Sequence, residues 1–328
     1  MKKEIIITIA CLLLFSCKPE KRFYEESGSV FHTLYHIKYE HDRLLTAEID
    51  RELQDFNLSL NPFNPNSTIS KVNRNEDVEV DSFFVAVFDR AKEIYRVSGG
   101  AFDPTVAPLI NLWGFGYRNF DGVTPEAVDS LKAIAGFDRI RLENRRAVKD
   151  DSRIELNFSA IAKGYASDVI AALLEREGVE NYMVEIGGEV AVKGKNPHRD
   201  CWQIGINRPE DDLTGFANEI ESIAVLCDRS GLATSGNYRN FYVKDGKKYA
   251  HTIDPRTGYP SEQTILSATV TAPDCMTADA CATAFMVLGA EKAIEMAKNV
   301  PGIDYYLICS DKSNGKYMTV RSLGINIK

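Results

Sequence analysis

Hydrophobic and polar residues alternate along some segments of the chain and recur every three or four positions along others, so the pattern predicts both strands and amphipathic helices. Residues 30–39 alternate as a half-buried strand does. Residues 44–58 and 83–97 place apolar side chains on one helical face, and the second helix is expected to end at Ser98-Gly99-Gly100. The same reasoning predicts helices over 123–137, 159–177 and from 276 onward, a hairpin over 139–156, and strands over 182–186, 189–192, 202–207 and 220–227.

The order of these elements lacks the regular strand–helix–strand alternation of a doubly wound parallel sheet. An α+β fold is therefore expected, with mixed, largely antiparallel sheets packed against helices. No tandem repeat, low-complexity stretch or linker-like composition divides residues 27–328. We predict that these residues form one functional domain.

Residues 1–17 have the pattern of a secretory signal peptide, with a charged start, an apolar run over residues 5–15 and a small residue before cysteine. The run is too short for a transmembrane helix, which needs about 20 residues. Leu14-Phe15-Ser16-Cys17 resembles a bacterial lipobox, which predicts a lipidated Cys17; an ordinary cleaved signal is the alternative. Residues 18–26 are charged and predicted to be a tether. The expected product is an exported, membrane-anchored lipoprotein facing the periplasm.

Composition and charge narrow the classes of function. The 44% hydrophobic and 26% charged residues are typical of a soluble globular protein. The chain has 47 acidic and 39 basic residues, so no basic excess exists to neutralise the phosphates of a nucleic acid, which is excluded as the main partner. Beyond Cys17, the cysteines are odd in number and widely spaced, which argues against a disulfide scaffold or zinc site. Most are expected to be small buried hydrophobic residues: Cys201, Cys227, Cys275, Cys281 and Cys309.

The segment Asn157-Phe158-Ser159-Ala160-Ile161-Ala162-Lys163 is a candidate phosphate site. A Ser cap followed by a helix with Lys163 in its first turn offers backbone N–H groups, a positive dipole end and one cation. The alternative is a capped helix with a solvated lysine. The spacing of a Walker A loop is missing.

Asp279 and Thr283 lie four positions apart on a predicted helix, hence one turn apart on one face. A carboxylate and a hydroxyl are hard oxygen ligands of the kind that hold Mg²⁺ together with substrate phosphates and water. The alternative is an acidic residue that favours the first turn of a helix and a threonine bonded to its own backbone.

The turn-rich segment from His251 to Pro260 contains two prolines and a glycine, which restrict its backbone. His251 is a candidate general base, and Arg256 is a candidate ligand for a phosphate or carboxylate. Asp254 and Arg256 could instead simply brace the turn. Two glycine-bearing segments, over 99–105 and 235–239, could approach a ligand closely. Flat surfaces for an aromatic ring system are offered by Phe102, Trp113 and Tyr238.

Taken together and in order, these segments resemble the ApbE family, the FAD:protein FMN transferases, over nearly all of residues 27–328. The matching segments are Gly100-Ala101-Phe102-Asp103-Pro104-Thr105-Val106-Ala107-Pro108-Leu109 with Leu112-Trp113-Gly114-Phe115-Gly116, Ala160-Ile161-Ala162-Lys163-Gly164-Tyr165-Ala166, Glu185-Ile186-Gly187-Gly188-Glu189, Thr234-Ser235-Gly236-Asn237-Tyr238-Arg239, His251 to Pro260, and Thr277-Ala278-Asp279-Ala280.

The resemblance implies an ApbE-like (T-fold-like) architecture and a Mg²⁺-dependent reaction with FAD as substrate. In that reaction AMP leaves and FMN is joined by a phosphoester to a threonine of an exported acceptor flavoprotein, such as a subunit of a membrane electron-transfer complex. It assigns the metal to the Ala160 carbonyl, Asp279 and Thr283, catalysis to His251 and Lys163, and flavin nucleotide contacts to Phe31, Phe63, Ala101, Phe102, Asp103, Asn157, Lys163 and Ile253.

The chain departs from the common family pattern at Phe31-His32, Phe63 and Asn157, where the family often has Met-Gly, Tyr and Asp. Two other functions use the same residues. One is Mg²⁺-dependent hydrolysis of FAD to FMN and AMP, with water in place of the threonine. The other is a non-catalytic flavin-binding lipoprotein.

Overall fold

The computed structural model describes residues 20–116, 122–210, 219–238, 241–244, 247–311 and 317–328. Within them an eight-stranded sheet crosses the molecule, and each neighbouring pair of strands is antiparallel. The predicted α+β class with largely antiparallel sheets is therefore confirmed. The strand order is β1 (Arg22–Val30), β2 (Thr33–His41), β5 (Tyr182–Ile186), β6 (Glu189–Lys193), β9 (Ser230–Gly236), β14 (Ile265–Ala272), β15 (Asp304–Ser310) and β16 (Tyr317–Arg321).

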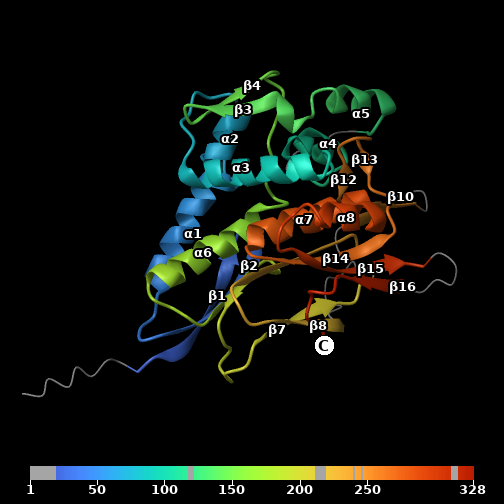
Figure 1. Ribbon diagram of the computed structural model, residues 1–328. Helices are drawn as coiled ribbons and strands as arrows, with labels where there is room; N and C mark the ends of the chain where they lie inside the picture. Colours follow the sequence, from blue (N-terminus) through green and yellow to red (C-terminus); the bar gives the residue numbers. More distant parts are fainter. Residues whose placement is uncertain (1–19, 117–121, 211–218, 239–240, 245–246, 312–316) are drawn as a thin grey trace, which may run out of the picture.

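Helices cover one face of this sheet, and a two-stranded ribbon covers part of the other (Figure 1). On the helical face lie α1 (Thr46–Leu60), α6 (Ala162–Arg176), α7 (Cys275–Leu288) and α8 (Ala290–Ala297). The ribbon is β7 (Trp202–Asn207) with β8 (Ile220–Leu226). The remaining elements are α2 (Thr68–Asn73), α3 (Ser82–Val97), α4 (Ala107–Leu112), α5 (Pro125–Lys132), the short 3₁₀ helices Pro104–Val106 and Phe137–Arg139, and the hairpins β3 (Ile140–Glu143) with β4 (Arg146–Lys149), β10 (Phe241–Lys244) with β11 (Lys247–Ala250), and β12 (Ile253–Asp254) with β13 (Tyr259–Pro260).

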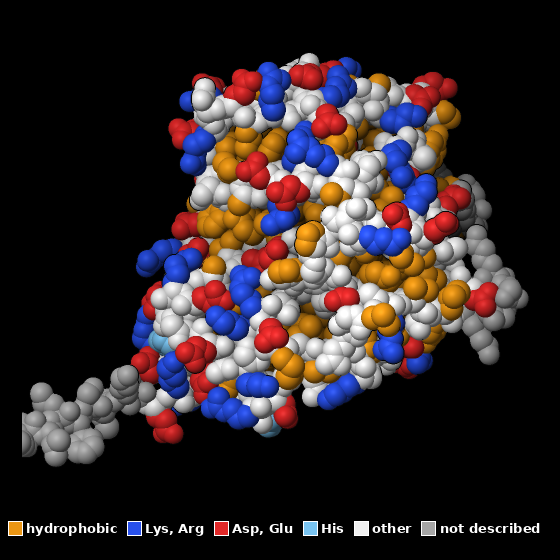
Figure 2. Space-filling model, viewed as in Figure 1, with side chains coloured by type: hydrophobic (Ala, Val, Ile, Leu, Met, Phe, Trp, Pro, Cys, Tyr) orange, Lys and Arg blue, Asp and Glu red, His pale blue; other side chains and the backbone are white. Residues whose placement is uncertain are grey.

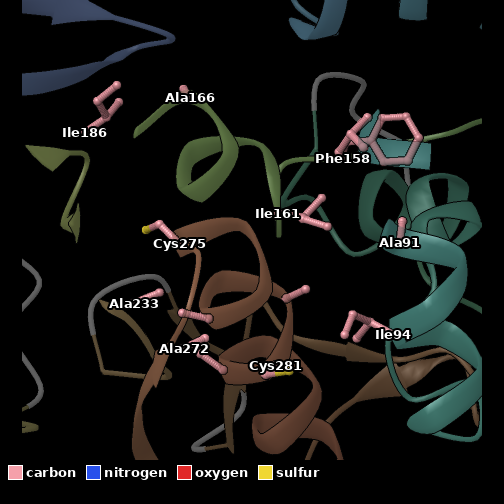
Figure 3. Packing of buried hydrophobic residues seen from close by; sticks show 14 of the residues in the cluster. Ala91, Ile94, Phe158, Ile161, Ala166, Ile186, Ala233, Ala272, Cys275 and Cys281 are labelled. Atoms are coloured by element: carbon pink, nitrogen blue, oxygen red, sulfur yellow. The ribbon is translucent and has the colours of Figure 1, made fainter. Parts of the chain in front are cut away.

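The main hydrophobic core fills the space between the sheet and its helices. Figure 3 shows side chains from α3, α6, α7 and the strands meeting there, among them Ile94, Ile161 and Cys281. α7 is the centre of this core, because nearly all of its side chains are buried. The helix that carries the candidate metal ligands is therefore held firmly on all sides.

A second core lies between the sheet and the β7–β8 ribbon, and a disulfide joins Cys201 to Cys227 across the ends of the two ribbon strands. The sequence argument against disulfides missed this pair, because only the antiparallel ladder brings the two cysteines together. The expectation of burial is confirmed for the three free cysteines, Cys275, Cys281 and Cys309.

Removing this disulfide is expected to destabilise the ribbon and the second core. The bond joins residues with a sequence separation of 26. A cross-link across a loop of that length restricts the unfolded chain and so stabilises the folded protein by about 3 kcal/mol. We expect the free energy of unfolding of the double variant Cys201→Ser, Cys227→Ser, measured in urea, to be lower by that amount. Dithiothreitol should shift the wild-type midpoint toward the variant and leave the variant unchanged. Equal midpoints for the variant and the wild type without dithiothreitol would contradict the prediction.

Several element boundaries differ from those predicted. The tether expected over 18–26 is wrong from Arg22 onward, because Arg22–Val30 forms β1 and pairs with β2 along its whole length. The predicted strand over 30–39 is the second strand of that hairpin. The helix predicted over 159–177 begins at Ala162, and the helix predicted over 123–137 is limited to α5. Residues 1–19, which include Cys17, lie outside the described residues.

The surface combines charges of both signs. On the face shown in Figure 2, acidic and basic side chains are interspersed, with hydrophobic side chains between them. Among the described residues, none of the helices combines the length and the apolar character needed to cross a bilayer.

Candidate active site

A pocket of about 820 Å³ lies at the end of the central sheet where β5 turns into β6 and β9 ends. The start of α6, one side of α7 and loops from distant parts of the chain contribute to its walls. Of the residues that the family resemblance assigns to the site, all but Phe31 line this pocket: Phe63, Ala101, Phe102, Asp103, Asn157, Ala160, Lys163, His251, Ile253, Asp279 and Thr283.

A buried cluster of charged groups lies in this pocket. Lys163, in the first turn of α6, donates a hydrogen bond from Nζ to Oε1 of Glu189, the first residue of β6. The Glu189 side chain is 5% exposed, and its Oε2 has no hydrogen-bond partner among the described residues. Asp279 is also buried and accepts a hydrogen bond through Oδ2 from the backbone N–H of Gly164, at 3.0 Å. Lys163 is thus paired directly with Glu189 and is attracted to Asp279 through charge alone.

Burial controls the protonation of this cluster. It raises the pKa of both carboxyl groups, Glu189 and Asp279, because surroundings of low dielectric constant disfavour their charged forms. Burial alone would lower the pKa of Lys163, but attraction to Glu189 and Asp279 outweighs it and raises that pKa. Lys163 therefore stays cationic. Its single charge does not neutralise both carboxylates, so a further cation in the pocket would stabilise their ionised forms.

The oxygen atoms nearby suit a divalent cation. Thr283 lies one turn after Asp279, and its Oγ1 is 3.2 Å from Oγ of Ser235 on β9. Ala160 lines the same pocket from the turn before α6. The described residues contain no group of three or more His, Cys, Asp or Glu side chains that could hold a metal. Oε2 of Glu189, which is buried without a hydrogen-bond partner among the described residues, and the Asp279 carboxylate, which acts on it electrostatically, nevertheless fit the charge of Mg²⁺ that is completed by substrate phosphates.

Close packing of α6 against α7 sets this geometry. A Cβ atom on Gly164 would lie 2.3 Å from the carbonyl oxygen of Cys275 and 2.8 Å from Cβ of Asp279. Only glycine lets the two helices approach so closely. Asp168, one turn further along α6, accepts hydrogen bonds from the backbone N–H groups of Cys275 and Met276, at 2.9 and 2.8 Å. The N-terminus of α7 is thereby fixed to α6.

Gly164→Ala is expected to destabilise the protein and to misplace Asp279. The added methyl group overlaps with backbone atoms, and overpacking of this kind costs about 1–3 kcal/mol. The free energy of unfolding, measured in urea, should fall by that amount. Ala172→Ser, at a half-buried position of the same helix, serves as a control and should change it by less than about 0.5 kcal/mol. A Gly164→Ala variant as stable as the wild type would show that the helices can separate without cost.

The predicted phosphate segment has a different local structure from the one expected. Ser159 is exposed and caps no helix, because α6 begins at Ala162 and has no side-chain cap. The backbone N–H of Ser159 instead donates to Oδ1 of Asn157 at 2.8 Å, which forms a tight turn ahead of the helix. Lys163 still lies in the first turn and still faces the pocket, so the cation and the helix N-terminus occur together as predicted.

The turn segment divides into two parts. His251, Thr252, Ile253 and Pro255 line the pocket. Arg256 donates two hydrogen bonds to the Asp254 carboxylate, at 2.9 and 2.8 Å, and the pair braces the turn. The bracing interpretation is therefore confirmed for these two residues. The side chain of His251 also lies edge-on to Phe115, with 6.4 Å between ring centres.

The aromatic residues have different positions. Phe63 is 54% exposed at the pocket wall, and Phe102 and Tyr238 are buried there. Trp113 does not line the pocket; it stacks on Tyr249, and its Nε1 donates to the carbonyl of Gly258 at 2.9 Å. At the tight turn between β1 and β2, the ring of Phe31 lies 5.3 Å from that of Phe56, and Phe31 does not line the pocket; its flavin contact stays a prediction.

Glu189 is the functional candidate that sequence reasoning missed. It belongs to Glu185-Ile186-Gly187-Gly188-Glu189, a matching motif to which no role was assigned. The two glycines have positive φ values, of 66° and 98°, and return the chain sharply into β6. That turn places Glu189 against Lys163, a contact between residues 26 positions apart.

Comparison with known proteins finds relatives that match nearly the whole chain. The model of the ApbE family matches residues 31–307. A protein of Haemophilus influenzae named FAD:protein FMN transferase is 38% identical, over 95% of this chain and 94% of its own length. A protein of the same name from Vibrio cholerae is 36% identical, over 91% of each chain.

Solved structures show the same relationship. The flavin transferase ApbE of Vibrio cholerae superposes with a TM-score of 0.82 at 34% identity, covering 92% of this chain and 98% of that one. The ApbE protein of Thermotoga maritima gives a TM-score of 0.78 at 27% identity, with coverage of 92% and 97%. The chain therefore belongs to the ApbE family, a family of enzymes.

Proposed function

We propose that this enzyme binds FAD in the pocket and transfers its FMN moiety to a threonine hydroxyl of an exported flavoprotein, releasing AMP. One observation carries the proposal. Lys163, His251, Asp279 and Thr283 come from distant parts of the chain, yet they line one pocket. The names of the relatives from Haemophilus influenzae and Vibrio cholerae support the same reaction.

The residues present match the needs of attack on a pyrophosphate. The threonine oxygen forms a bond with the phosphorus of the FMN half, and the bond from that phosphorus to the bridging oxygen breaks, so AMP leaves with the bridging oxygen. His251 accepts the hydroxyl proton. Lys163 and the N-terminus of α6 stabilise negative charge on the phosphate oxygens. Phe63, Phe102 and Tyr238 offer apolar surface to the rings of the dinucleotide.

The Ala160 carbonyl, Asp279 and Thr283 would hold Mg²⁺. The bound ion would supply neutralisation of the pyrophosphate charge. The chain's own part is to hold the Asp279 carboxylate in place and to oppose the rise of its pKa on burial. Gly164 contributes to this through the hydrogen bond from its backbone N–H.

We further propose that the enzyme acts outside the cytoplasm, held to the membrane by a lipid on Cys17. The disulfide between Cys201 and Cys227 supports this location, because such bonds persist in oxidising compartments. The acceptor would be a flavoprotein that exposes its threonine in the same compartment, such as a subunit of a membrane electron-transfer complex.

The proposal is tested by expressing the enzyme together with exported flavoproteins and measuring their masses. We expect one of them to gain the mass of FMN on a threonine, and AMP to form in equal amount when purified enzyme, FAD, Mg²⁺ and that acceptor are mixed. Free FMN with no mass gain on any acceptor would establish hydrolysis instead. FAD binding without AMP at any Mg²⁺ concentration would establish a binding protein.

A further inference from the structure

The strand β7 has an open edge that faces the pocket. Among the described strands, β7 pairs with β8 alone. Three consecutive residues, Gln203, Ile204 and Gly205, line the pocket. Because successive side chains of a strand point to opposite faces, three consecutive lining residues mean that the pocket borders the edge of the strand and not one of its faces.

The register shows which backbone groups lie on this edge. On the far side of β8, Ile223 N–H donates to the carbonyl of Lys328, and Lys328 N–H donates to the carbonyl of Ile223, at 3.3 and 2.9 Å. Val225 N–H donates to Asn326 in the same way, at 2.9 Å. The residue between them, Ala224, therefore directs its N–H and C=O toward β7, where it pairs with Ile204.

Gln203 and Gly205, on either side of Ile204, consequently point their N–H and C=O groups away from β8. No backbone hydrogen bond joins either residue to another segment within the described part of the chain. A glycine inside a strand often marks a place where another backbone comes close. Gly205 fits this pattern, because the three atoms nearest to a Cβ built there all belong to the side chain of Ile220, at 3.3 Å or more, and none to another backbone segment. The backbone N–H and C=O groups of Gln203 and Gly205 thus face the pocket, which gives two donors and two acceptors along this edge.

We propose that this edge binds the acceptor protein, with an extended segment around the threonine adding to β7 as a further strand. The inference rests on the proposed transfer function, which requires a polypeptide to enter this pocket. An edge strand is a template for another chain, and main-chain hydrogen bonds supply affinity in such recognition. The edge shares its pocket with His251 and Lys163, so a segment bound along it delivers a hydroxyl to the reaction site.

The test uses the full-length enzyme, FAD, Mg²⁺ and a synthetic peptide that spans the flavinylated threonine of the acceptor found by mass spectrometry. Backbone N-methylation is introduced at one peptide position at a time. We expect kcat/KM for FMN transfer to fall about tenfold at alternate positions and little at those between, because only every second N–H faces β7. Hydrogen exchange at the Gln203 and Gly205 amides should slow when the peptide is present.

Variants of the enzyme give an independent measurement. Gly205→Pro removes one outward N–H and should raise KM for the peptide about tenfold, with KM for FAD nearly unchanged. Gly205→Ala keeps that N–H and should lie closer to the wild type. Losses without the two-residue period would overturn the proposal. Protection of the two amides by FAD alone would also overturn it and would assign the edge to the flavin. If the unmodified peptide gains no FMN while FAD is still turned over, the transfer function fails and this inference fails with it.

Discussion

Replacing Asp279 with asparagine is expected to slow AMP release from FAD by a factor of about 100 to 1,000 while the fold stays intact. Asparagine has nearly the same shape, and its Oδ1 can still accept the hydrogen bond from Gly164 N–H. What is lost is the carboxylate that would hold Mg²⁺. The variant should also need a higher Mg²⁺ concentration for half-maximal rate.

In contrast to its effect on the rate, Asp279→Asn should not lower the stability of the fold. The substitution leaves Lys163 and Glu189 as a neutral pair and removes a charge from a site where burial disfavours it. We expect the free energy of unfolding in urea to stay the same or to increase. Glu295→Gln, which removes an exposed partner of Lys298, controls for the loss of a carboxylate and should leave AMP release unchanged. An Asp279→Asn enzyme that retains the full rate would contradict the metal assignment.

Replacing His251 with alanine is expected to lower FMN transfer by a factor of about 100 to 10,000, because the threonine hydroxyl loses its general base. FAD affinity, measured by quenching of flavin fluorescence, should change only a few-fold. The transfer rate of the variant should rise with pH, since hydroxide must replace the missing base. His198→Ala, at an exposed loop position, should behave as the wild type. Unchanged transfer by His251→Ala would assign the base to another group.

Local patterns were enough to predict the elements that fold against the core. The strands at Trp202–Asn207 and Tyr182–Ile186 have the predicted bounds, and α3 differs by one residue. β1 was missed because it is an edge strand whose exposed positions carry only charged and hydroxyl side chains, so its composition matches that of a tether. At Phe31 and His32 the chain turns with two positive φ values, of 52° and 59°, although neither residue is glycine. A turn of that kind leaves no mark in the sequence.

The candidate site was more predictable than its surroundings. Lys163, His251, Asp279 and Thr283 stand in recognisable motifs, and each of them lines the pocket. Glu189 and the edge of β7 were not found, because their roles depend on contacts made only in the folded chain. Glu189 acts through an ion pair with Lys163, and the orientation of Gln203 and Gly205 follows from pairing of β8 with the last residues of the chain.

The wide separation of the pocket residues has a consequence for biogenesis. The lining extends from Phe63 to Val287, and α7, which carries Asp279 and Thr283, follows β14 in the chain and packs against β9 and β14. A nascent or partly translocated chain therefore lacks the site until nearly all of it has folded. If the protein acts outside the cytoplasm, as proposed, and crosses the membrane unfolded, turnover would begin only at the destination. The FAD pool of the cytoplasm would thus be spared during synthesis and transit.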